Sequence, residues 1–483
     1  MDNHLHLLYR SDNALNYAEH TAYSCEGVEP SHISQAMLDV AQSGEFHPPD
    51  YEVPYCKNQF DRLIYAPNPV PQFSEQAPAR DGSFEKIAEL IKGAKYEVVY
   101  STMWYDSDVD EDSPDNPGVV VAGAIKELYD QLETNPSKYP RGISVKILLD
   151  NPPELTASRF ISQVWNVFND LRDAGVPMMS NPEIGWDLQV ANYEGSWPHG
   201  HTKLVVVDGK TAVAAGFNFQ YAHYPEEHRS GHGKGRVDLG LQITGPVAQA
   251  ALRAFDDLWI GATRISCPDL DSVSPLWWVS CRKSVAEVAH PPEVLRYYLP
   301  EANANAFALH RTEVYKESDL SVTHAIESAE KSLDIIQVNF TFGIVCNLNA
   351  LFEVCDYDSV PIYIDAIMTA VEKEHIPVRI LIEDDGIEGF ENNIAVTILL
   401  DELKARDLSD FVEIRHFTGL VHAKSVLIDE QFLVVGSQNF HYSAYGKSGL
   451  TEFNIATDDA QAIEDYKALF EYHWERGTLL EPK

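Results

Sequence analysis

Residues 422–440 read HAKSVLIDEQFLVVGSQNF, and residues 201–219 read HTKLVVVDGKTAVAAGFNF. In both stretches a histidine is followed, at the same spacing, by a lysine, an aspartate and an asparagine. A matched set of polar residues inside two apolar segments is hard to reach by chance. The sequence therefore predicts that the chain contains an internal duplication.

Each copy predicts a β-hairpin. Residues 201–207 are apolar and rich in valine, and Asp208-Gly209 is a strong signal for a tight turn before a second apolar strand. The second copy turns at Asp429-Glu430. Side chains two residues apart on a strand share a face, so we expect each histidine and its lysine to point the same way. The two aspartates are interpreted as turn residues and not as acids of a mechanism.

The duplication extends beyond the hairpins, because helices and strands alternate in the same order before each one. Strands of continuous valine, isoleucine and leucine between amphipathic helices predict sheets covered on both faces. The expected fold class is α/β: two α/β/α sandwich halves related by a pseudo-twofold axis, with the active site at their interface. The expected helices are 83–91, 119–132, 158–174, 322–331, 362–373 and 392–405, and the expected strands before the hairpins are 96–100, 145–150, 333–338 and 378–383.

These patterns divide the chain into four parts. Residues 1–80 form a proline-containing extension, with one short helix near residues 32–42, that we expect to pack on the first half. Residues 81–262 form the first half, residues 263–305 connect the halves, and residues 306–483 form the second half.

The residue types in the two motifs indicate phosphodiester chemistry. A phosphodiester needs cations and amide donors around its non-bridging oxygens. Lysine and asparagine side chains supply both. One histidine can attack phosphorus, and a second can protonate the leaving oxygen and then activate water. The predicted site residues of this kind are His201, Lys203, Asn218, His422, Lys424 and Asn439.

Each catalytic imidazole needs a partner, usually a carboxylate, that fixes its other nitrogen. Asp238 and Glu452 each follow one motif and interrupt an apolar strand. An unpaired acid would be costly there. They are therefore predicted to orient the histidines.

The chain resembles the phospholipase D superfamily, whose signature is H-x-K-x4-D-x6-G-[GS]-x-N. The second copy matches at every position, and the first departs only at Ala215, where the family has a glycine, a change expected to narrow the first half-site. The resemblance implies a covalent phosphohistidine intermediate and no metal or other cofactor. It also implies that His201 is the nucleophile and His422 the general acid and base, while an exchange of these roles stays open.

Composition constrains the substrate. The 483 residues include 36 basic and 74 acidic side chains, a formal charge of −38. Nucleic-acid binders usually present a basic face, so a non-specific nuclease is disfavoured. Strongly anionic membranes would repel the chain, whereas a zwitterionic lipid or a small diester would not. A salt-adapted source would also explain the acidity.

The sequence also predicts the compartment. It contains no apolar stretch of membrane-spanning length and no signal peptide at residue 1. Its six cysteines show no CxxC spacing and are expected to be free, buried thiols. A cytoplasmic protein is therefore predicted.

Two further segments allow a functional or a structural interpretation. Residues 221–234 contain His223, His228 and His232, and their glycines favour a solvated or substrate-facing loop over a metal site. Trp277-Trp278 suits lipid insertion, but packing of the connection is favoured.

We therefore predict a phosphodiesterase resembling phospholipase D that cleaves or exchanges a phospholipid head group. Contact with a membrane surface is allowed, and the oligomeric state is not predicted. The alternatives are a metal-independent nuclease of the same superfamily and a phosphate-binding protein without turnover.

Overall fold

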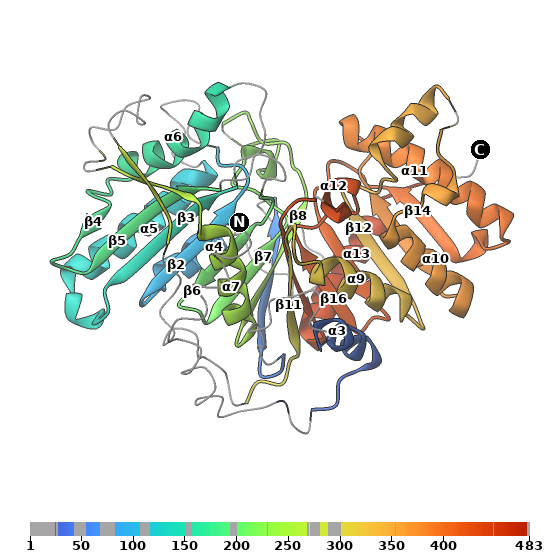
Figure 1. Cartoon of the computed structure of the whole chain (residues 1–483), viewed down its shortest axis with the longest axis horizontal. Coiled ribbons are helices and arrows are strands. Elements are labelled where there is room, and N and C mark those ends of the chain that lie inside the picture. Colours follow the sequence, from blue (N-terminus) through green and yellow to red (C-terminus); the bar gives the residue numbers. More distant parts are fainter. Residues whose placement is uncertain are drawn as a thin grey trace.

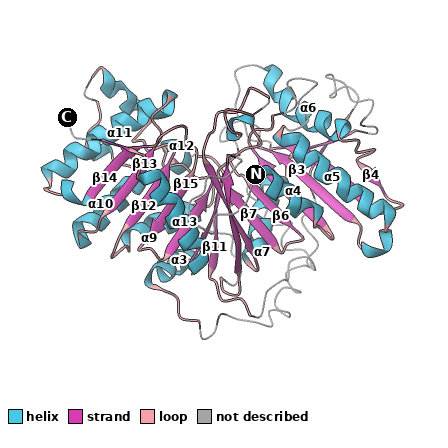
Figure 2. Cartoon of the chain, turned by 180° about the vertical axis from the view of Figure 1, so that it is seen from behind, coloured by secondary structure: helices cyan, strands magenta, loops and turns pink. Residues whose placement is uncertain are grey.

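Two helix-covered β-sheets stand side by side in the computed structural model of the chain (Figures 1 and 2). The structure describes residues 25, 28–42, 55–67, 83–106, 116–150, 157–193, 200–228, 230–267, 270, 281–287, 301–352, 354–447 and 449–480. The Trp277-Trp278 pair lies outside these residues.

The sheet of the first half runs in the order β1-β8-β7-β6-β2-β3-β5-β9-β10, with β4 paired to β5. Its parallel pairs are β2 with β3 and β3 with β5, and the other pairs are antiparallel. The strands are β1 (Gln59–Ala66), β2 (Glu97–Thr102), β3 (Ile143–Leu149), β4 (Ser180–Asn181), β5 (Trp186–Asn192), β6 (Leu204–Val207), β7 (Thr211–Ala215), β8 (Asp238–Thr244), β9 (Thr263–Ser266) and β10 (Arg282–Val285).

The sheet of the second half runs in the order β11-β17-β16-β15-β12-β13-β14-β18. It repeats the order of the first sheet from β1 to β9, without counterparts of β4 and β10, and has parallel pairs in the centre and an antiparallel strand at each edge. The strands are β11 (Ala306–Arg311), β12 (Leu333–Gln337), β13 (Val378–Ile382), β14 (Val412–His416), β15 (Lys424–Ile428), β16 (Phe432–Gly436), β17 (Glu452–Thr457) and β18 (Thr478–Leu479).

The helices follow the same repeat. In the first half they are α4 (Ser83–Lys92), α5 (Pro117–Thr134), α6 (Ala157–Asp173) and α7 (Val247–Trp259). In the second half they are α9 (Glu317–Glu327), α10 (Ile362–Glu374), α11 (Gly386–Ala405), α12 (Tyr442–Tyr445) and α13 (Ala460–Trp474). The start of α5 shows how the local sequence begins a helix. The Asn116 side chain caps the helix by accepting a hydrogen bond from the Val119 N–H, and Pro117, which has no N–H to donate, occupies the first turn.

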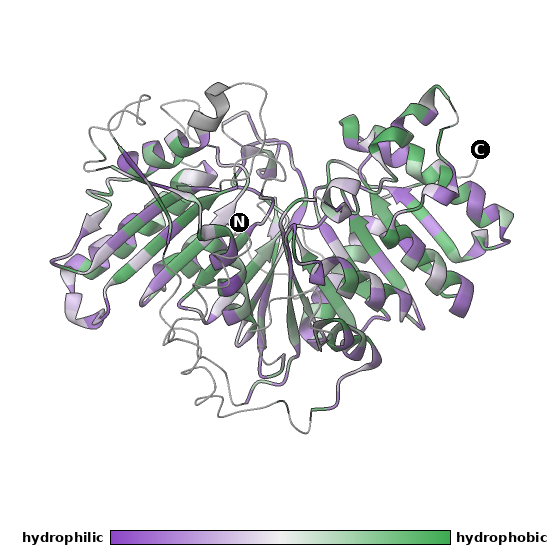
Figure 3. Cartoon of the chain, in the orientation of Figure 1, coloured by the Kyte–Doolittle hydropathy of each residue, from purple (hydrophilic) through white to green (hydrophobic). Residues whose placement is uncertain are grey.

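Three apolar cores hold the layers together. One lies under α4, α5 and α6, and its counterpart lies under α9, α10 and α11. The third combines α7 and α13 with the facing sides of both sheets, so the two halves share it. Figure 3 shows the apolar strands as green arrows between helices of mixed character. The predicted α/β class with two α/β/α halves is confirmed.

The element boundaries differ from the predictions at α11, which begins at Gly386 and not at residue 392, at α9 and at the motif strands. Helix α9 begins at Glu317, earlier than expected, and ends at Glu327. The motif strands β6 and β15 begin at Leu204 and Lys424, after the histidines, because the residues before them pair across the seam between the halves. No helix within the described residues is long and apolar enough to cross a membrane.

The N-terminal extension packs differently from the prediction. Its strand β1 joins the first sheet beside β8, but its helix α3 (His32–Gln42) packs against α9 of the second half, with Ile33 and Met37 in that core. The extension thus lies on the first half through β1, as expected, and also on the second half through α3, which was not expected. The helix itself was predicted because its apolar positions follow a helical period.

The cysteine prediction was also wrong. All six cysteines are paired, as Cys25–Cys56, Cys267–Cys281 and Cys346–Cys355. The pairs join residues 31, 14 and 9 positions apart. Such spacings resemble no common motif, so only the tertiary structure reveals the partners.

Candidate active site

The two motifs meet at a seam built by backbone pairing between the halves. Gly200 bridges Thr451, and Val237 bridges Val421. The His201 N–H donates to the Thr451 carbonyl at 3.0 Å, and the His422 N–H donates to the Val237 carbonyl at 2.7 Å. Each motif histidine is thus tied to the residue that precedes the predicted acid of the other half.

Each predicted acid consequently contacts the histidine of the other half. Nδ1 of His201 lies 2.9 Å from both carboxylate oxygens of Glu452, and Nδ1 of His422 lies 2.7 Å from Oδ2 of Asp238. Both carboxylates are fully buried. Donation from Nδ1 fixes each ring and leaves Nε2 as the nitrogen with a free lone pair.

Electrostatics keep both imidazoles neutral. Burial, followed by the charge of Lys203, holds the pKa of His201 well below its ordinary value, and burial followed by Lys424 does the same for His422. Burial raises the pKa of Asp238 to about 7 and that of Glu452 to about 8. An unprotonated Nε2 is what a nucleophile or a general base requires.

The two motif lysines lie beside the histidines. Nζ of Lys203 donates to the His201 carbonyl at 2.7 Å, and Nζ of Lys424 donates to the His422 carbonyl. Burial lowers the pKa of Lys203 to about 8 and that of Lys424 to about 7. The charges of both lysines lower the pKa of each histidine, so all four groups lie within electrostatic range of one another. A bound phosphate would favour the protonated lysines.

The motif asparagines lie beside the ends of the neighbouring strands. Oδ1 of Asn218 accepts from the Trp104 N–H at 3.3 Å, which turns its amide nitrogen away from that strand. Oδ1 of Asn439 is buried and has no hydrogen-bond partner. A buried polar atom without a partner is unusual away from functional sites.

The motif aspartates have an architectural position, as the turn interpretation requires. The Asp208 carboxylate accepts from the backbone N–H groups of residues 95–97, and the Asp429 carboxylate accepts from those of residues 330–332. Both aspartates have a positive φ, 56° in each case. They tie each hairpin turn to the start of β2 or β12, and neither bonds to a catalytic histidine.

A second pair of acids was missed in the sequence. Asp150 accepts from the Thr202 hydroxyl at 2.7 Å, and Glu383 accepts from the Val421 N–H at 2.6 Å. Each acid therefore holds a residue next to one motif histidine. The signal was present, because both acids directly follow equivalent buried strands, β3 and β13.

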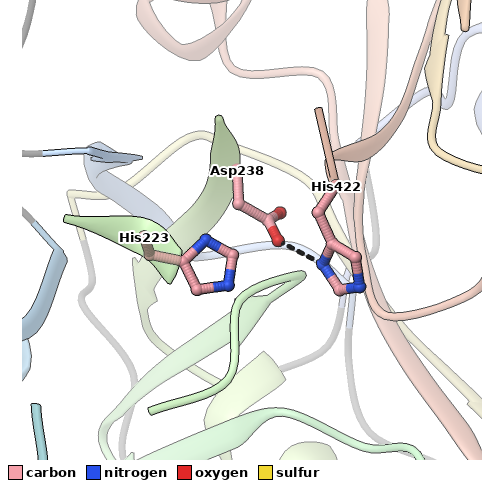
Figure 4. Close-up of side chains that lie close together, drawn as sticks. All are labelled: His223, Asp238 and His422. Carbon is pink, nitrogen blue, oxygen red and sulfur yellow. Dashed lines mark hydrogen bonds and ion pairs between the residues drawn. The ribbon is translucent and has the colours of Figure 1, made fainter. Parts of the chain in front are cut away.

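His223 lies beside His422 and is buried, so of the two interpretations of this loop the substrate-facing one fits His223 better than the solvated one. It is buried at the end of a short helix, η2 (Tyr221–His223), with its ring centroid 5.8 Å from that of His422 (Figure 4). Its Nδ1 lies 3.2 Å from the Arg236 carbonyl, and its Nε2 has no partner. Burial lowers the pKa of His223 to about 3.

The arrangement around His223 was tested as a metal site. Ligand atoms of His223, Asp238 and His422 lie within 4.8 Å of one another. However, Nζ of Lys424 lies 2.8 Å from Nδ1 of His422, so a metal on that nitrogen would lie against an ammonium group. These charges disfavour a metal there, and the expectation of no metal or cofactor stays a prediction.

The departure from the family signature falls in the core. Ala215 packs among the apolar residues under α4, so its methyl group does not narrow the phosphate site as expected. At the next position, a Cβ on Gly216 would lie 2.0 Å from Oδ1 of Asp238, whereas the equivalent Ser437 donates to Glu452 at 2.5 Å. The two half-sites are therefore similar but not identical.

Comparison with known proteins finds a similar domain and a similar fold. The family model described as "Cardiolipin synthase, PLD-like domain" matches residues 322–474, which include the second motif and Glu452. Residues 322–474 are therefore similar to this PLD-like domain, in line with the resemblance of the two motifs to the phospholipase D superfamily. Phosphatidylserine synthase of Haemophilus influenzae Rd KW20 has the same fold, with 13% identity, a TM-score of 0.55 and coverage of 92% of each chain. No curated protein matches the chain.

Two smaller proteins of known structure are also similar, and the first is described as a phospholipase D family member. Nuc of Salmonella typhimurium is 18% identical, with a TM-score of 0.29, and covers 37% of this chain and 99% of its own. NucT of Helicobacter pylori is 17% identical, with a TM-score of 0.28, and covers 37% of this chain and 100% of its own.

Proposed function

We propose that the chain is a phosphodiesterase that cleaves or exchanges a phospholipid head group through a phosphohistidine. The observation that carries this proposal is the crossed pair of buried histidine–carboxylate contacts, at 2.9 Å and 2.7 Å, flanked by Lys203 and Lys424. A neutral imidazole supplies a nucleophile, a second imidazole that takes up a proton when the anionic phosphate binds supplies a proton donor, and the two lysines stabilise charge in the same site.

The proposed reaction has two displacements. Nε2 of His201 attacks phosphorus, the bond to the leaving oxygen breaks, and His422 in its protonated form gives its proton to that oxygen. His422, now neutral, then takes a proton from water or an alcohol, which attacks phosphorus and releases His201. Lys203, Lys424, Asn218 and Asn439 stabilise the charge on the non-bridging oxygens.

A cavity beside His422 supports a substrate that carries a positive charge. Its volume is about 530 Å³, and Leu420, two residues before His422, lies in its wall. The acids that line it are Glu226, Glu227, Glu383, Asp384 and Asp385, with Lys234 as the basic residue. Such a wall suits a choline- or ethanolamine-like group and opposes a polyanion, which favours a zwitterionic phospholipid over the nuclease alternative.

The compartment is part of the proposal. A cytoplasmic location remains the prediction from the sequence, but three disulfides oppose it, because structural disulfides persist mainly in oxidising compartments. Titration of free thiols in the protein as isolated, before and after reduction, tests whether the cysteines are paired, as in an oxidising compartment, or free, as in the cytoplasm.

A substrate panel in the presence of a chelator tests the proposed function. Phosphatidylcholine with a primary alcohol should yield free choline and a phosphatidyl alcohol. Single-stranded DNA and RNA should stay intact, and their digestion without lipid turnover would establish the nuclease alternative. Failure of every substrate, in a correctly folded protein, would favour phosphate binding without turnover.

Trapping of the intermediate tests the chemistry itself. His422→Asn should slow turnover severely and, with an activated leaving group, let a labelled phosphohistidine accumulate. His201→Ala should abolish the label. A label that survives in His201→Ala and disappears in His422→Asn would exchange the roles of the two histidines.

A further inference from the structure

A cluster of exposed apolar side chains lies on the second half, apart from the three cores. The segment that follows β12 forms a short helix, η4 (Ile344–Ala350), and then turns back. Six side chains of this segment are 46–76% exposed, and we call them, with Ile387 and Phe390 of α11, the apolar cap. The six are Ile344, Val345, Leu348, Leu351, Phe352 and Val354.

The apolar cap is held in a fixed shape. A disulfide joins Cys346 to Cys355 across the segment. The Asn349 side chain accepts from the Val354 and Cys355 N–H groups at 2.9 Å and donates to the Cys355 carbonyl at 2.7 Å. These contacts fix the turn while the apolar side chains point to solvent. A folded protein rarely maintains such a surface without a partner.

Side-chain contacts lead from the apolar cap to His441, two residues after Asn439 of the second motif. Asn347, within η4, donates to Glu391 of α11 at 2.5 Å, and the other oxygen of Glu391 lies 3.3 Å from Nε2 of His441. The charge of His441 in turn lowers the pKa of His201. Figure 1 places α11 and α12, which follows His441, on the same side of the second half. A surface bound to the apolar cap would therefore lie at the rim of the site.

We propose that the apolar cap inserts into the surface of a zwitterionic phospholipid bilayer and so presents the lipid to the histidines. This inference rests on the proposed function and specifies how its substrate is reached. Leucine, isoleucine and phenylalanine side chains gain free energy on entering the boundary between head groups and acyl chains. Two exposed acids beside the apolar cap, Asp356 and Asp358, and the partly exposed Glu388 oppose an anionic surface.

Vesicle binding tests the proposal directly. The probe is sucrose-loaded vesicles of pure phosphatidylcholine, and the readout is the protein fraction that sediments with them. Leu351→Ser/Phe352→Ser removes the two most exposed side chains of the segment, at 76% and 67%. We expect the partition coefficient to fall at least about tenfold, because two large apolar groups no longer enter the bilayer. Vesicles rich in phosphatidylglycerol should bind the wild type more weakly.

The matched control is Val285→Ser/Leu479→Ser, which removes two exposed apolar side chains, 61% and 48% exposed, from sheet strands β10 and β18. It should sediment as the wild type does. Turnover of a soluble, monomeric phosphocholine diester should be equal in all three proteins, and thermal unfolding should show that each is folded.

Two results would overturn the inference: wild-type protein that stays in the supernatant with phosphatidylcholine vesicles, or a Leu351→Ser/Phe352→Ser variant that still sediments fully. A third result would come from analytical ultracentrifugation. A dimer that dissociates in this variant would show that the apolar cap is a contact between two copies of the chain. Vesicle binding without turnover of any diester would instead support membrane binding by the apolar cap and refute the proposed function.

Discussion

Glu452, in the second half of the chain, contacts Nδ1 of His201, in the first half, at 2.9 Å. Asp238 of the first half contacts His422 of the second at 2.7 Å. Neither histidine has a carboxylate from its own half on Nδ1 among the described residues. The halves are thus joined in function at the same seam where their backbones pair.

The crossed contacts predict distinct defects for the two acids. Glu452→Gln should impair the attack by His201, and Asp238→Asn should impair proton donation by His422, each by roughly 10²–10⁴-fold in kcat. A nitrophenyl diester needs little protonation on leaving. Rapid mixing should therefore show a burst of nitrophenol in Asp238→Asn and none in Glu452→Gln. The opposite pattern would mean that His422, and not His201, is the nucleophile.

The sequence predicted the duplicated α/β order, and the spacing within each motif placed eight side chains in one proposed site, because that spacing is local information. It did not show that each acid contacts the histidine of the other half. Asp238 and Glu452 stand at equivalent positions in the two halves, and only the docking of the halves selects their partners. The sequence did not place His223 beside His422 for the same reason. Burial of a glycine-rich segment against His422 is a tertiary property.

Asp208 offers a test of the turn interpretation. Its carboxylate accepts from the Lys95, Tyr96 and Glu97 N–H groups. Asp208→Asn loses part of this acceptor capacity and should lower the free energy of unfolding by about 1–3 kcal/mol. Because Asp208 does not contact the histidines, kcat should change less than about threefold. Urea unfolding and initial rates measure both quantities, and a catalytic loss without a stability loss would contradict the interpretation.

His223 should act by packing against His422. His223→Ala removes the ring that lies 5.8 Å from the His422 ring, and freer motion of that imidazole should lower kcat about tenfold with little change in KM. His223→Phe restores an aromatic ring without the unpartnered Nε2 and should recover most of the rate. If His223→Phe is as slow as His223→Ala, Nε2 itself takes part in the reaction.

The acid-lined cavity predicts head-group preference. Glu226→Gln/Glu227→Gln removes two charges from its wall without touching the histidines. KM for phosphatidylcholine should rise about threefold to tenfold, and turnover of phosphatidylglycerol should improve, because the wall no longer repels an anionic surface as strongly. Competition between the two lipids in mixed micelles measures the ratio of kcat/KM for phosphatidylcholine to kcat/KM for phosphatidylglycerol. An unchanged ratio would show that the cavity does not bind the head group.

The buried carboxylates predict a pH-dependent stability. Burial raises the pKa of Glu452 from 4.5 to about 8, so the folded chain keeps this proton at pH values where the unfolded chain loses it. The contribution of Glu452 to stability is therefore full below pH 4.5 and is lost as the pH rises toward about 8.

The variant Glu452→Gln tests this pH dependence, because its side chain cannot ionise. Its free energy of unfolding, relative to the wild type, should increase across this interval and level off above it. Denaturant unfolding at several pH values measures the difference, with Glu183→Gln at an exposed site as the control. A difference that stays constant or shrinks with rising pH would show that Glu452 is ionised in the folded site at neutral pH.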